Sequence, residues 1–333
     1  MKVSIIIPAY NAEKTIAATI ECLLRQTYNN IEIIVVDDGS QDRTAEVLDN
    51  YNDNEKIRII HKQNGGVSSA RNLGIRESTG DCLMFVDADD LCHTDMVESI
   101  INKMQSEKVE YVIAGFIRVK EKKRINCLFG DRIFRSKEEI RANIEFIMSN
   151  GLNSPYSKLY VTRLIRENHI SFDEALPLGE DLNFNLEYLF CVESVAYLDK
   201  CIYEYLVFNS IATTIYREDL YHRRMLSLQR MNTTFEENGL INPIENELRI
   251  KIFYATLFNL HKRNCPLSFN KKIQLIRDVK REYLSLPRKR LCGIYRVLFL
   301  LAYIFPAWVL YWVAKTIQIV MGIFPERIRG VSV

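Results

Sequence analysis

The sequence has neither a strong charge of one sign nor a paired cysteine motif. Its 333 residues carry 44 Lys and Arg against 42 Asp and Glu, a net charge of +2, so the composition gives no reason to expect nucleic acid as a partner. The eight cysteines are scattered, with no Cys-x-x-Cys pair and no histidine spacing typical of a zinc site. We therefore expect reduced thiols in a cytoplasmic protein instead of disulfides or structural zinc.

Two common phosphate-binding loops are also missing. The first apolar run, Val3–Ile7, ends at Pro8 and is too short for a signal peptide, so we expect none. The loop that follows is Pro8–Asn11. A dinucleotide-binding fold would place Gly-x-Gly-x-x-Gly there, and a P-loop would place Gly-Lys-Ser/Thr there. The sequence therefore excludes both of these nucleotide-binding classes.

Short apolar runs alternate with helical patterns over the first hundred residues. Strands are expected at 3–7, 31–36, 57–60 and 83–86, with a helical pattern after each of the first three. This alternation predicts an α/β fold with a mixed, mostly parallel sheet covered by helices. The loops that follow parallel strands lie at one edge of the sheet, which is where open α/β sheets bind ligands.

Three acids follow the fourth predicted strand. Asp87, Asp89 and Asp90 lie within four positions, and carboxylates crowded in this way repel each other unless a cation neutralises them. Carboxylate oxygens favour Mg²⁺ or Mn²⁺. The other interpretation is a helix cap, with Asp89 or Asp90 at the start of a helix over 93–105. The cluster alone does not decide between the two.

Other loops at the same edge carry groups suited to a nucleoside diphosphate. Tyr10 offers an aromatic face, and Asp37 offers an acceptor for a base N–H or ribose hydroxyls. Asn64 and the glycines after it open a helix, whose free N–H groups attract anions, and Arg71 lies one turn further on. Simple turn chemistry and a solvated arginine are the alternatives. Together with the acids, these groups indicate a nucleoside diphosphate and its cation.

Four segments resemble family 2 glycosyltransferases, in the expected order: Ile5–Glu13, Val35–Ser40, Asn64–Asn72 and Phe85–Asp90. The resemblance is dense over residues 1–100 and continues more weakly through Ser157–Tyr160 and Gly179–Phe184. That family has the GT-A fold, inverts the anomeric carbon and mostly uses UDP-sugars. The resemblance therefore implies transfer of a sugar, a hexosyl or N-acetylhexosaminyl group, from a UDP-sugar to a hydroxyl of a glycan or a lipid-linked saccharide.

The resemblance also assigns roles to individual residues. It implies that donor binding involves Pro8, Tyr10, Asn11, Glu13, Asp37, Asn64, Arg71, Asp87 and Ala88. Asp89 would bind Mn²⁺ or Mg²⁺ at the diphosphate, with Asp90 as a possible support. Asp181 matches the family's catalytic base, with Glu180 beside it. Tyr156 stands where relatives often carry Trp, and Val207 where Arg is common, which leaves the acceptor open.

The chemistry of inversion agrees with a single carboxylate at Asp181. Glu180 and Asp181 precede an apolar helical stripe, where a carboxylate is also a routine cap. An acceptor hydroxyl attacks C1 poorly unless a base removes its proton, and a divalent ion neutralises the leaving diphosphate. A glycosidase would instead need two carboxylates flanking the bond.

The C-terminal part differs in composition. Residues 277–296 are rich in Lys and Arg, and 297–314 carry no charge, with Pro306 in the middle. Eighteen residues is at the lower limit for a membrane span. A hairpin bent at Pro306, or a helix in the interface, keeps both basic flanks on one side. We therefore expect monotopic attachment to the cytoplasmic face of the membrane, near a polyprenyl-linked acceptor. A buried helix or a subunit interface is the alternative.

These observations predict three regions. Residues 1–215 form the catalytic domain, with nucleotide-sugar binding in 1–100 and the acceptor side and base in 101–215. Residues 216–287 form a helical annex, and 288–333 the membrane-associating segment. Two other functions fit less well. A sugar nucleotidyltransferase would need a Gly-rich basic loop after the first strand, and a non-catalytic membrane scaffold would not need Asp37, Asp87, Asp89 and Asp181 together.

Overall fold

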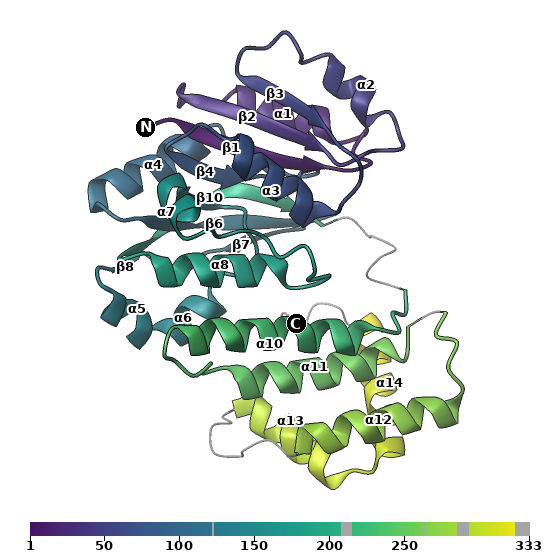
Figure 1. Ribbon diagram of the computed structural model, residues 1–333. Helices are drawn as coiled ribbons and strands as arrows, with labels where there is room; N and C mark the ends of the chain where they lie inside the picture. The colour runs from purple at the N-terminus through teal and green to yellow at the C-terminus, as the bar shows by residue number, and fades with distance from the viewer. Residues whose placement is uncertain (122, 208–214, 263, 285–292, 324–333) are drawn as a thin grey trace. The chain divides into compact units, whose positions relative to one another are not determined.

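The computed structural model describes residues 1–121, 123–207, 215–262, 264–284 and 293–323. The chain divides into two compact units, Met1–Phe208 and Asn209–Val333 (Figure 1). The first contains one large sheet and the helices that cover it, and the second contains helices. The predicted α/β fold with a C-terminal helical region is confirmed.

The first half of unit Met1–Phe208 forms the parallel part of the sheet. Its elements are β1 Val3–Ala9, α1 Ile16–Leu24, β2 Ile31–Asp37, α2 Thr44–Asp49, β3 Ile57–His61, α3 Val67–Glu77 and β4 Cys82–Phe85. These strands lie in the order β3-β2-β1-β4, all parallel. Ile5, Ile33 and Met84 are fully buried. Helices cover both faces of this region, so the side chains on both faces of its strands are mostly apolar.

The second half adds antiparallel strands and makes the sheet mixed. Its elements are β5 Leu91–Cys92, α4 Met96–Glu107, β6 Tyr111–Lys120, β7 Lys123–Cys127, β8 Arg132–Phe134, α5 Lys137–Ala142, α6 Ile144–Ser149, β9 Lys158–Val161, α7 Thr162–Glu167, α8 Glu180–Cys191 and β10 Val195–Leu206. The order continues β4-β9-β6-β10-β5, and β9 is antiparallel to both of its neighbours.

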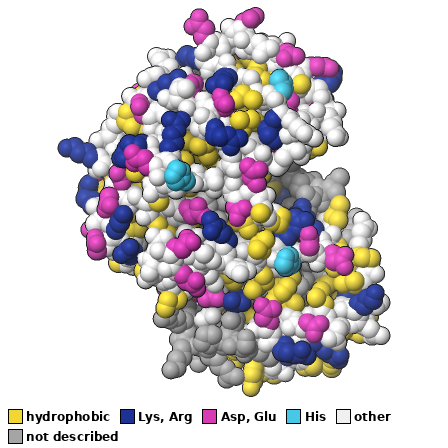
Figure 2. Space-filling view, viewed as in Figure 1, with side chains coloured by type: hydrophobic (Ala, Val, Ile, Leu, Met, Phe, Trp, Pro, Cys, Tyr) yellow, Lys and Arg dark blue, Asp and Glu magenta, His cyan; other side chains and the backbone are white. Residues whose placement is uncertain are grey.

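On the face shown in Figure 2, Lys and Arg are interspersed with Asp and Glu.

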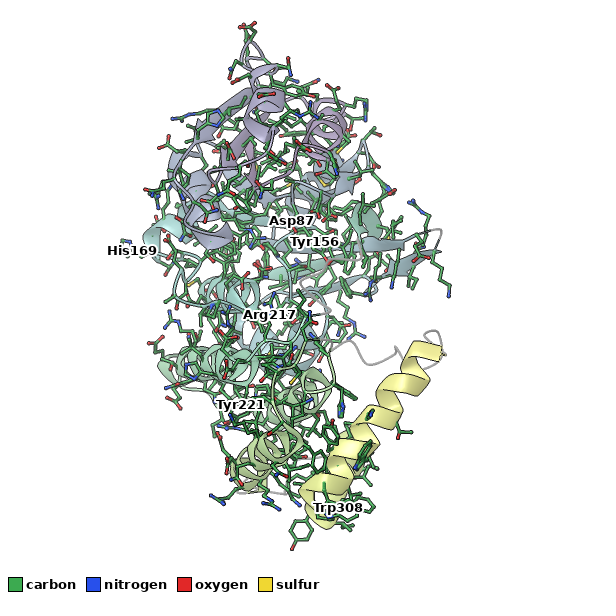
Figure 3. The ribbon with its side chains drawn as sticks, turned by 90° about the vertical axis from the view of Figure 1, so that its right-hand side faces the viewer. Asp87, Tyr156, His169, Arg217, Tyr221 and Trp308 are labelled. Carbon is green, nitrogen blue, oxygen red and sulfur yellow. The ribbon has the colours of Figure 1, made fainter. Side chains whose placement is uncertain are left out.

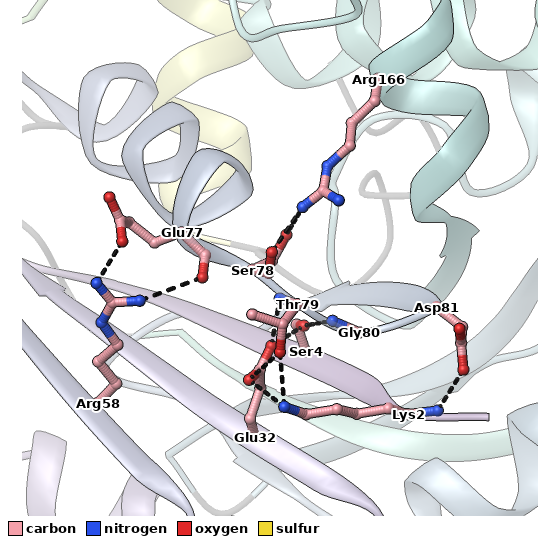
Figure 4. Close-up of polar contacts among 10 residues, drawn as sticks. All are labelled: Lys2, Ser4, Glu32, Arg58, Glu77, Ser78, Thr79, Gly80, Asp81 and Arg166. Carbon is pink, nitrogen blue, oxygen red and sulfur yellow. Dashed lines mark hydrogen bonds and ion pairs between the residues drawn. The ribbon is translucent and has the colours of Figure 1, made fainter.

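An ionic cluster lies at the end of the sheet where β1 and β2 begin (Figure 4). The Glu32 carboxylate accepts hydrogen bonds from Lys2 Nζ at 2.6 Å, from the Thr79 N–H at 2.6 Å and from Ser4 Oγ. Burial alone would raise the pKa of Glu32, but these donors lower it to about 2. The cluster joins β1, β2 and the loop before β4, and so fixes the start of the strands whose other ends carry the site.

We expect Glu32→Gln to lower the free energy of unfolding at pH 7 by about 2 kcal/mol, because the folded-state pKa of Glu32 lies below its unfolded value. That stabilisation is present above about pH 4.5 and is lost as the pH falls toward about 2. Urea unfolding at several pH values measures it. Glu77→Gln is the control, since its pair with the half-exposed Arg58 contributes less than about 1 kcal/mol. Equal losses in both variants at pH 7 would contradict the assignment.

The second unit is a helical bundle. Its helices are α10 Leu220–Glu237, α11 Glu245–Asn259, α12 Phe269–Leu284, α13 Gly293–Ile304 and α14 Ala307–Ile323. Its core is built by Phe253, Leu257, Ile276, Phe299 and Leu310, all nearly inaccessible to solvent. The break between α13 and α14 falls at the predicted bend, Pro306. In the described ranges, no helix is long and apolar enough to cross a membrane. Residues 288–292 and those from 324 on lie outside the described residues.

Candidate functional site

A cavity of about 310 Å³ opens where β1 ends and α3 begins. Its lining residues are Pro8, Ala9, Tyr10, Asp38, Asn64, Gly66, Val67 and Ala70. Tyr10 is 47% exposed although it follows a largely buried strand, so its ring is available to a ligand. Three of the predicted donor-binding residues, Pro8, Tyr10 and Asn64, therefore meet at one cavity. Asp38, which sequence reasoning did not single out, lies there as well.

Asp38 and not a free anion site occupies the start of α3. The Asp38 carboxylate accepts the N–H groups of Gly65 and Gly66 at 2.9 and 2.7 Å, and Lys62 Nζ at 2.6 Å. Asn64 Nδ2 donates to the Asp38 carbonyl at 2.9 Å. The helix start does attract an anion, as its dipole requires, but the protein supplies that anion itself. The expectation of free N–H groups is therefore wrong for Gly65 and Gly66.

Asp37 is buried beside this loop. One of its oxygens accepts the Ser40 N–H at 3.0 Å, and the other lies 2.8 Å from His61 Nδ1. Asp37 is 3% exposed and is not among the residues that line the cavity. Its predicted contact with the base or ribose stays a prediction. The structure shows a carboxylate that anchors the end of β2 to the end of β3.

Asn11 and Glu13 connect the first two loops of the site. The Asn11 N–H donates to Ser40 Oγ at 3.0 Å, and Asn11 Oδ1 accepts the Gln41 N–H at 2.8 Å. Glu13 accepts the Arg43 N–H at 3.1 Å. Asn11 has a left-handed backbone, with φ of 52°, which asparagine tolerates better than most residues. Both side chains thus hold the turn that carries Tyr10.

Arg71 joins the predicted catalytic base, Asp181, to the predicted donor-binding residue Asp87. Its guanidinium donates to Asp181 Oδ1 at 2.6 Å and to Asp87 Oδ1 at 3.0 Å. The group is packed over the Phe172 ring, 5.1 Å from its centroid, and Arg71 is 4% exposed. The alternative of a solvated arginine is therefore wrong. Although burial opposes its charge, the two carboxylates hold the pKa of Arg71 above its ordinary value.

Asp181 lies in the first turn of α8 and has an unusual acidity. Burial raises its pKa to about 7, and the Arg71 charge opposes this rise without cancelling it. Its Oδ2 accepts no hydrogen bond within the described ranges. No side-chain cap bond is present at the start of α8, where Gly179 occupies the cap position. The capping role considered for Asp181 is therefore not what the structure shows.

Lys158 adds a second perturbed group nearby. It is 2% exposed, and its Nζ donates to the Tyr156 carbonyl at 3.1 Å. Burial lowers the pKa of Lys158 to about 7, against the opposing effect of the Asp181 charge. Sequence reasoning gave Lys158 no role, although it stands in the Ser157–Tyr160 segment that carried the weaker resemblance. Paired perturbed groups of this kind cluster at functional sites.

The three acids after β4 face different environments. Asp90 is fully buried and accepts Tyr203 Oη at 2.7 Å and the Leu206 N–H at 2.8 Å. Burial and the Asp87 charge raise the pKa of Asp90 to about 8. Asp90 therefore ties this loop to β10 through both of its carboxylate oxygens. Its possible support of the cation stays a prediction.

Asp89 is the exposed member of the three. Partial burial and the neighbouring Asp87 charge raise its pKa above the ordinary value, so the position favours a cation. The helix-cap alternative is wrong for both Asp89 and Asp90, because α4 begins at Met96 with Asp95 at its cap position. Ala88, between Asp87 and Asp89, is buried, and its carbonyl accepts a hydrogen bond from Thr19 Oγ1 at 3.0 Å.

An aromatic stack lies next to Asp87 (Figure 3). Tyr156 packs parallel to Tyr203, with ring centroids 4.6 Å apart, and also stacks on Tyr205 at 5.5 Å. Tyr203 Oη accepts the Asp87 N–H at 3.1 Å while it donates to Asp90. The position where relatives often carry Trp is thus part of a packed aromatic wall. The sequence does not predict this role of Tyr203, because it depends on the pairing of β10 with β5 and β6.

Within the described ranges, no group of three or more His, Cys, Asp or Glu side chains is arranged to hold a metal ion. Mg²⁺, however, is commonly held by one or two carboxylates together with substrate phosphates. Asp87 and Asp89 provide two carboxylates separated by one residue. The residues present therefore fit a cation that is shared with a diphosphate, and do not fit a cage made by protein alone.

Several known proteins are similar to this chain in sequence. The model of the family described as glycosyl transferase family 2 matches residues 4–152. The Bacillus subtilis protein named uncharacterized glycosyltransferase EpsJ is 31% identical over 284 residues, which cover 82% of this chain and 83% of the relative. The Borreliella burgdorferi cholesterol galactosyltransferase is 25% identical over 295 residues, covering 85% and 81%.

Solved structures show the same fold. A crystal structure of Staphylococcus aureus TarS, residues 1–349 in complex with UDP, superposes with a TM-score of 0.67 at 20% identity, covering 100% of this chain and 94% of the other. A second, in complex with UDP-GlcNAc, gives 0.66 at 20% identity, with 96% and 92% covered. These matches show the predicted GT-A fold. Together with the extent and identity of the sequence matches, they show that this chain belongs to glycosyl transferase family 2 and is a glycosyltransferase.

Proposed function

We propose that the enzyme transfers a sugar from a UDP-sugar to a hydroxyl of a glycan or a lipid-linked saccharide, with inversion at the anomeric carbon. The observation that carries this proposal is the bridge made by Arg71. It holds Asp181, a carboxylate with a pKa of about 7, beside Asp87. Arg71 directly follows Ala70, which lines the cavity next to Tyr10. One base and one donor cavity are what an inverting transferase requires.

The cavity supports a nucleotide donor. Tyr10 offers an exposed ring for a base, and the volume of about 310 Å³ lies at the lower end of the range for small-molecule pockets. The TarS structures of the same fold were solved with UDP and with UDP-GlcNAc. A UDP-sugar is therefore the donor we propose, with Pro8, Tyr10 and Asn64 at the nucleoside and Asp87 at the ribose or sugar.

The catalytic step is assigned to Asp181. Because Arg71 engages Oδ1, Oδ2 is left to accept the proton of the acceptor hydroxyl as its oxygen attacks C1. The bond from C1 to the UDP oxygen breaks, and UDP leaves with the electron pair. A base whose pKa lies near the working pH is the most effective for such a transfer. Glu180, the adjacent acid, contributes to the raised pKa through its charge.

A divalent cation is part of this proposal. Asp89, with Asp87, would hold Mn²⁺ or Mg²⁺ together with the diphosphate, and the ion would neutralise charge on the leaving group. Arg71 does not replace it, because its guanidinium already donates to two carboxylates. Asp90 would support this loop through its bonds with Tyr203 and Leu206.

For the acceptor we propose a chemical class and not an individual molecule. Tyr205, which stacks on the buried Tyr156, is partly exposed and is the ring of this stack that a sugar can contact. The Borreliella relative is named for transfer to a lipid. We propose a glycan or polyprenyl-linked saccharide.

The test is UDP release from a panel of UDP-sugars, measured with Mn²⁺ or Mg²⁺ and with EDTA. The proposal expects one or a few UDP-sugars to release UDP faster when acceptor saccharides are added, and expects EDTA to stop the reaction. Release from GDP- or CMP-sugars but from no UDP-sugar would overturn the donor assignment. Full activity in EDTA would overturn the role given to Asp89.

A further inference from the structure

Two helices of the second unit are apolar on both of their sides. The inner sides of α13 and α14 enter the core through Phe299, Ala302, Leu310 and Ala314. Their outer sides are apolar as well, and the large residues among them are 45–66% exposed: Val297, Leu300, Tyr303, Ile304, Trp308 and Trp312. These six residues are called the outer face below. A helix that is apolar all round is normally buried in a core or in a membrane.

The outer face is a property of these helices and not of the whole bundle. α12 packs against the same core through Ile273, Ile276 and Val279, but its solvent side carries Arg277 and Arg281. The outer face continues from α13 to α14 across the break at Pro306. The residues on the two sides of this break, Ile304 and Trp308, are 66% and 55% exposed. Figure 3 shows Trp308 at the start of α14, at the periphery of the unit. Six large apolar side chains that are about half exposed on two consecutive helices favour an interaction surface.

Basic side chains border this face. Lys315 Nζ lies 4.7 Å from the centroid of the Trp312 ring, and Lys280 Nζ donates to the Phe305 carbonyl at 2.7 Å. The sequences of α12, α13 and α14 together carry seven Lys and Arg against two acids, and both acids are on α12. A second copy of the chain would bring these like charges together. An anionic surface would instead be attracted by about 1 kcal/mol for each nearby Lys or Arg.

Over the described residues, both helices are shorter than the hydrocarbon core of a bilayer. α13 has 12 residues and α14 has 17, so they measure about 18 and 26 Å against a hydrocarbon core of about 30 Å. Trp and Tyr prefer the boundary between lipid headgroups and acyl chains. A bent helical pair with aromatic residues at its bend and cations at its border matches a helix pair lying in that boundary.

We propose that the outer face docks the enzyme on a bilayer that contains anionic lipids, with Trp308 and Trp312 inserted at the headgroup level. The occupant is the lipid surface itself. This inference does not depend on the sugar transferred or on the base, because it concerns helices outside the catalytic unit. It would also place the enzyme where a lipid-linked acceptor is found, if the proposed function holds.

The chain carries its own reporter for this test, because Trp308 and Trp312 are its only two tryptophans. The full chain is mixed with vesicles of phosphatidylcholine alone, or of phosphatidylcholine with about one quarter phosphatidylglycerol. We expect the anionic vesicles to shift the tryptophan emission to the blue, and lipids brominated near the headgroup to quench it. Unchanged emission with both vesicles, or quenching only by lipids brominated at the chain ends, would overturn the proposal.

Variants separate docking from other causes. The double variant Trp308→Ser/Trp312→Ser should bind anionic vesicles at least about tenfold more weakly in a flotation assay, because two half-exposed aromatic rings are lost. Ile241→Ser, which removes a 73% exposed apolar residue elsewhere in the same unit, should bind like the wild type. An emission shift that depends on protein concentration in the absence of lipid would identify a second copy as the occupant and overturn the proposal. UDP release in the absence of lipid should be the same in all three proteins, so a failure of docking is distinguishable from a failure of the proposed transfer.

Discussion

Asp181→Asn is expected to lower kcat by about 10²–10⁴-fold, the usual contribution of a positioned general base. Asn keeps an oxygen that can accept from Arg71 Nη1, as Asp181 Oδ1 does, so the bridge to Asp87 should persist. It cannot remove a proton from the acceptor. KM for the UDP-sugar should therefore change little. Steady-state kinetics with saturating acceptor, together with UDP binding by calorimetry, measure the two effects separately.

Glu180→Gln is the matched control for this prediction. It removes a carboxylate from the same turn of α8, and Glu180 affects Asp181 only through its charge. We expect a change in kcat of less than about tenfold, with a somewhat lower pKa for Asp181. If Asp181→Asn instead loses UDP affinity or unfolds at a lower temperature with normal kcat, Asp181 holds the donor or the fold, and the base lies elsewhere.

Asp89→Asn is expected to reduce transfer by at least about 100-fold while the fold survives, because a carboxylate shared with the diphosphate and its cation is lost. Asp89 is exposed, so its replacement leaves no buried group without a partner. The apparent affinity for Mn²⁺, measured in the presence of UDP, should fall with the rate. Thermal unfolding without ligands should be unchanged.

Asp90→Asn provides the contrast one residue away. Asp90 is buried, accepts Tyr203 Oη and the Leu206 N–H, and holds the loop to β10. Its replacement should lower the unfolding temperature and leave the Mn²⁺ affinity close to normal. An equal loss of Mn²⁺ affinity in both variants, or no loss in Asp89→Asn, would contradict the assignment of the metal to Asp89.

The parallel part of the sheet could be predicted from the sequence for a simple physical reason. Strands covered on both faces must be apolar throughout, so β1, β2 and β4 appear as short apolar runs bounded by polar loops. The insertion of β9 between β4 and β6 could not be predicted in this way. Its four residues include the buried Lys158, and its place depends on pairing with strands far away in the sequence.

Many residues of the site could be predicted from the sequence, but most of the contacts between them could not. The sequence predicts the acids after β4, but it does not show that Tyr203 and Leu206 bind Asp90 from β10. Asp37 and Asp38 are adjacent, and only the three-dimensional path of the next loop decides which carboxylate meets Gly65 and Gly66. The contact between Arg71 and Asp181 spans 110 positions, and no local pattern encodes it.

The central claim is that Asp181 removes the proton of the acceptor, and the pH dependence of kcat/KM tests it most directly. A base acts only when deprotonated, and the pKa of Asp181 is raised to about 7. The account predicts that log(kcat/KM) of the wild type rises with a slope of about one up to about pH 7 and is level above it. In Asp181→Asn the residual rate should lose this rise. A rise near pH 7 that persists unchanged in the variant would contradict the account.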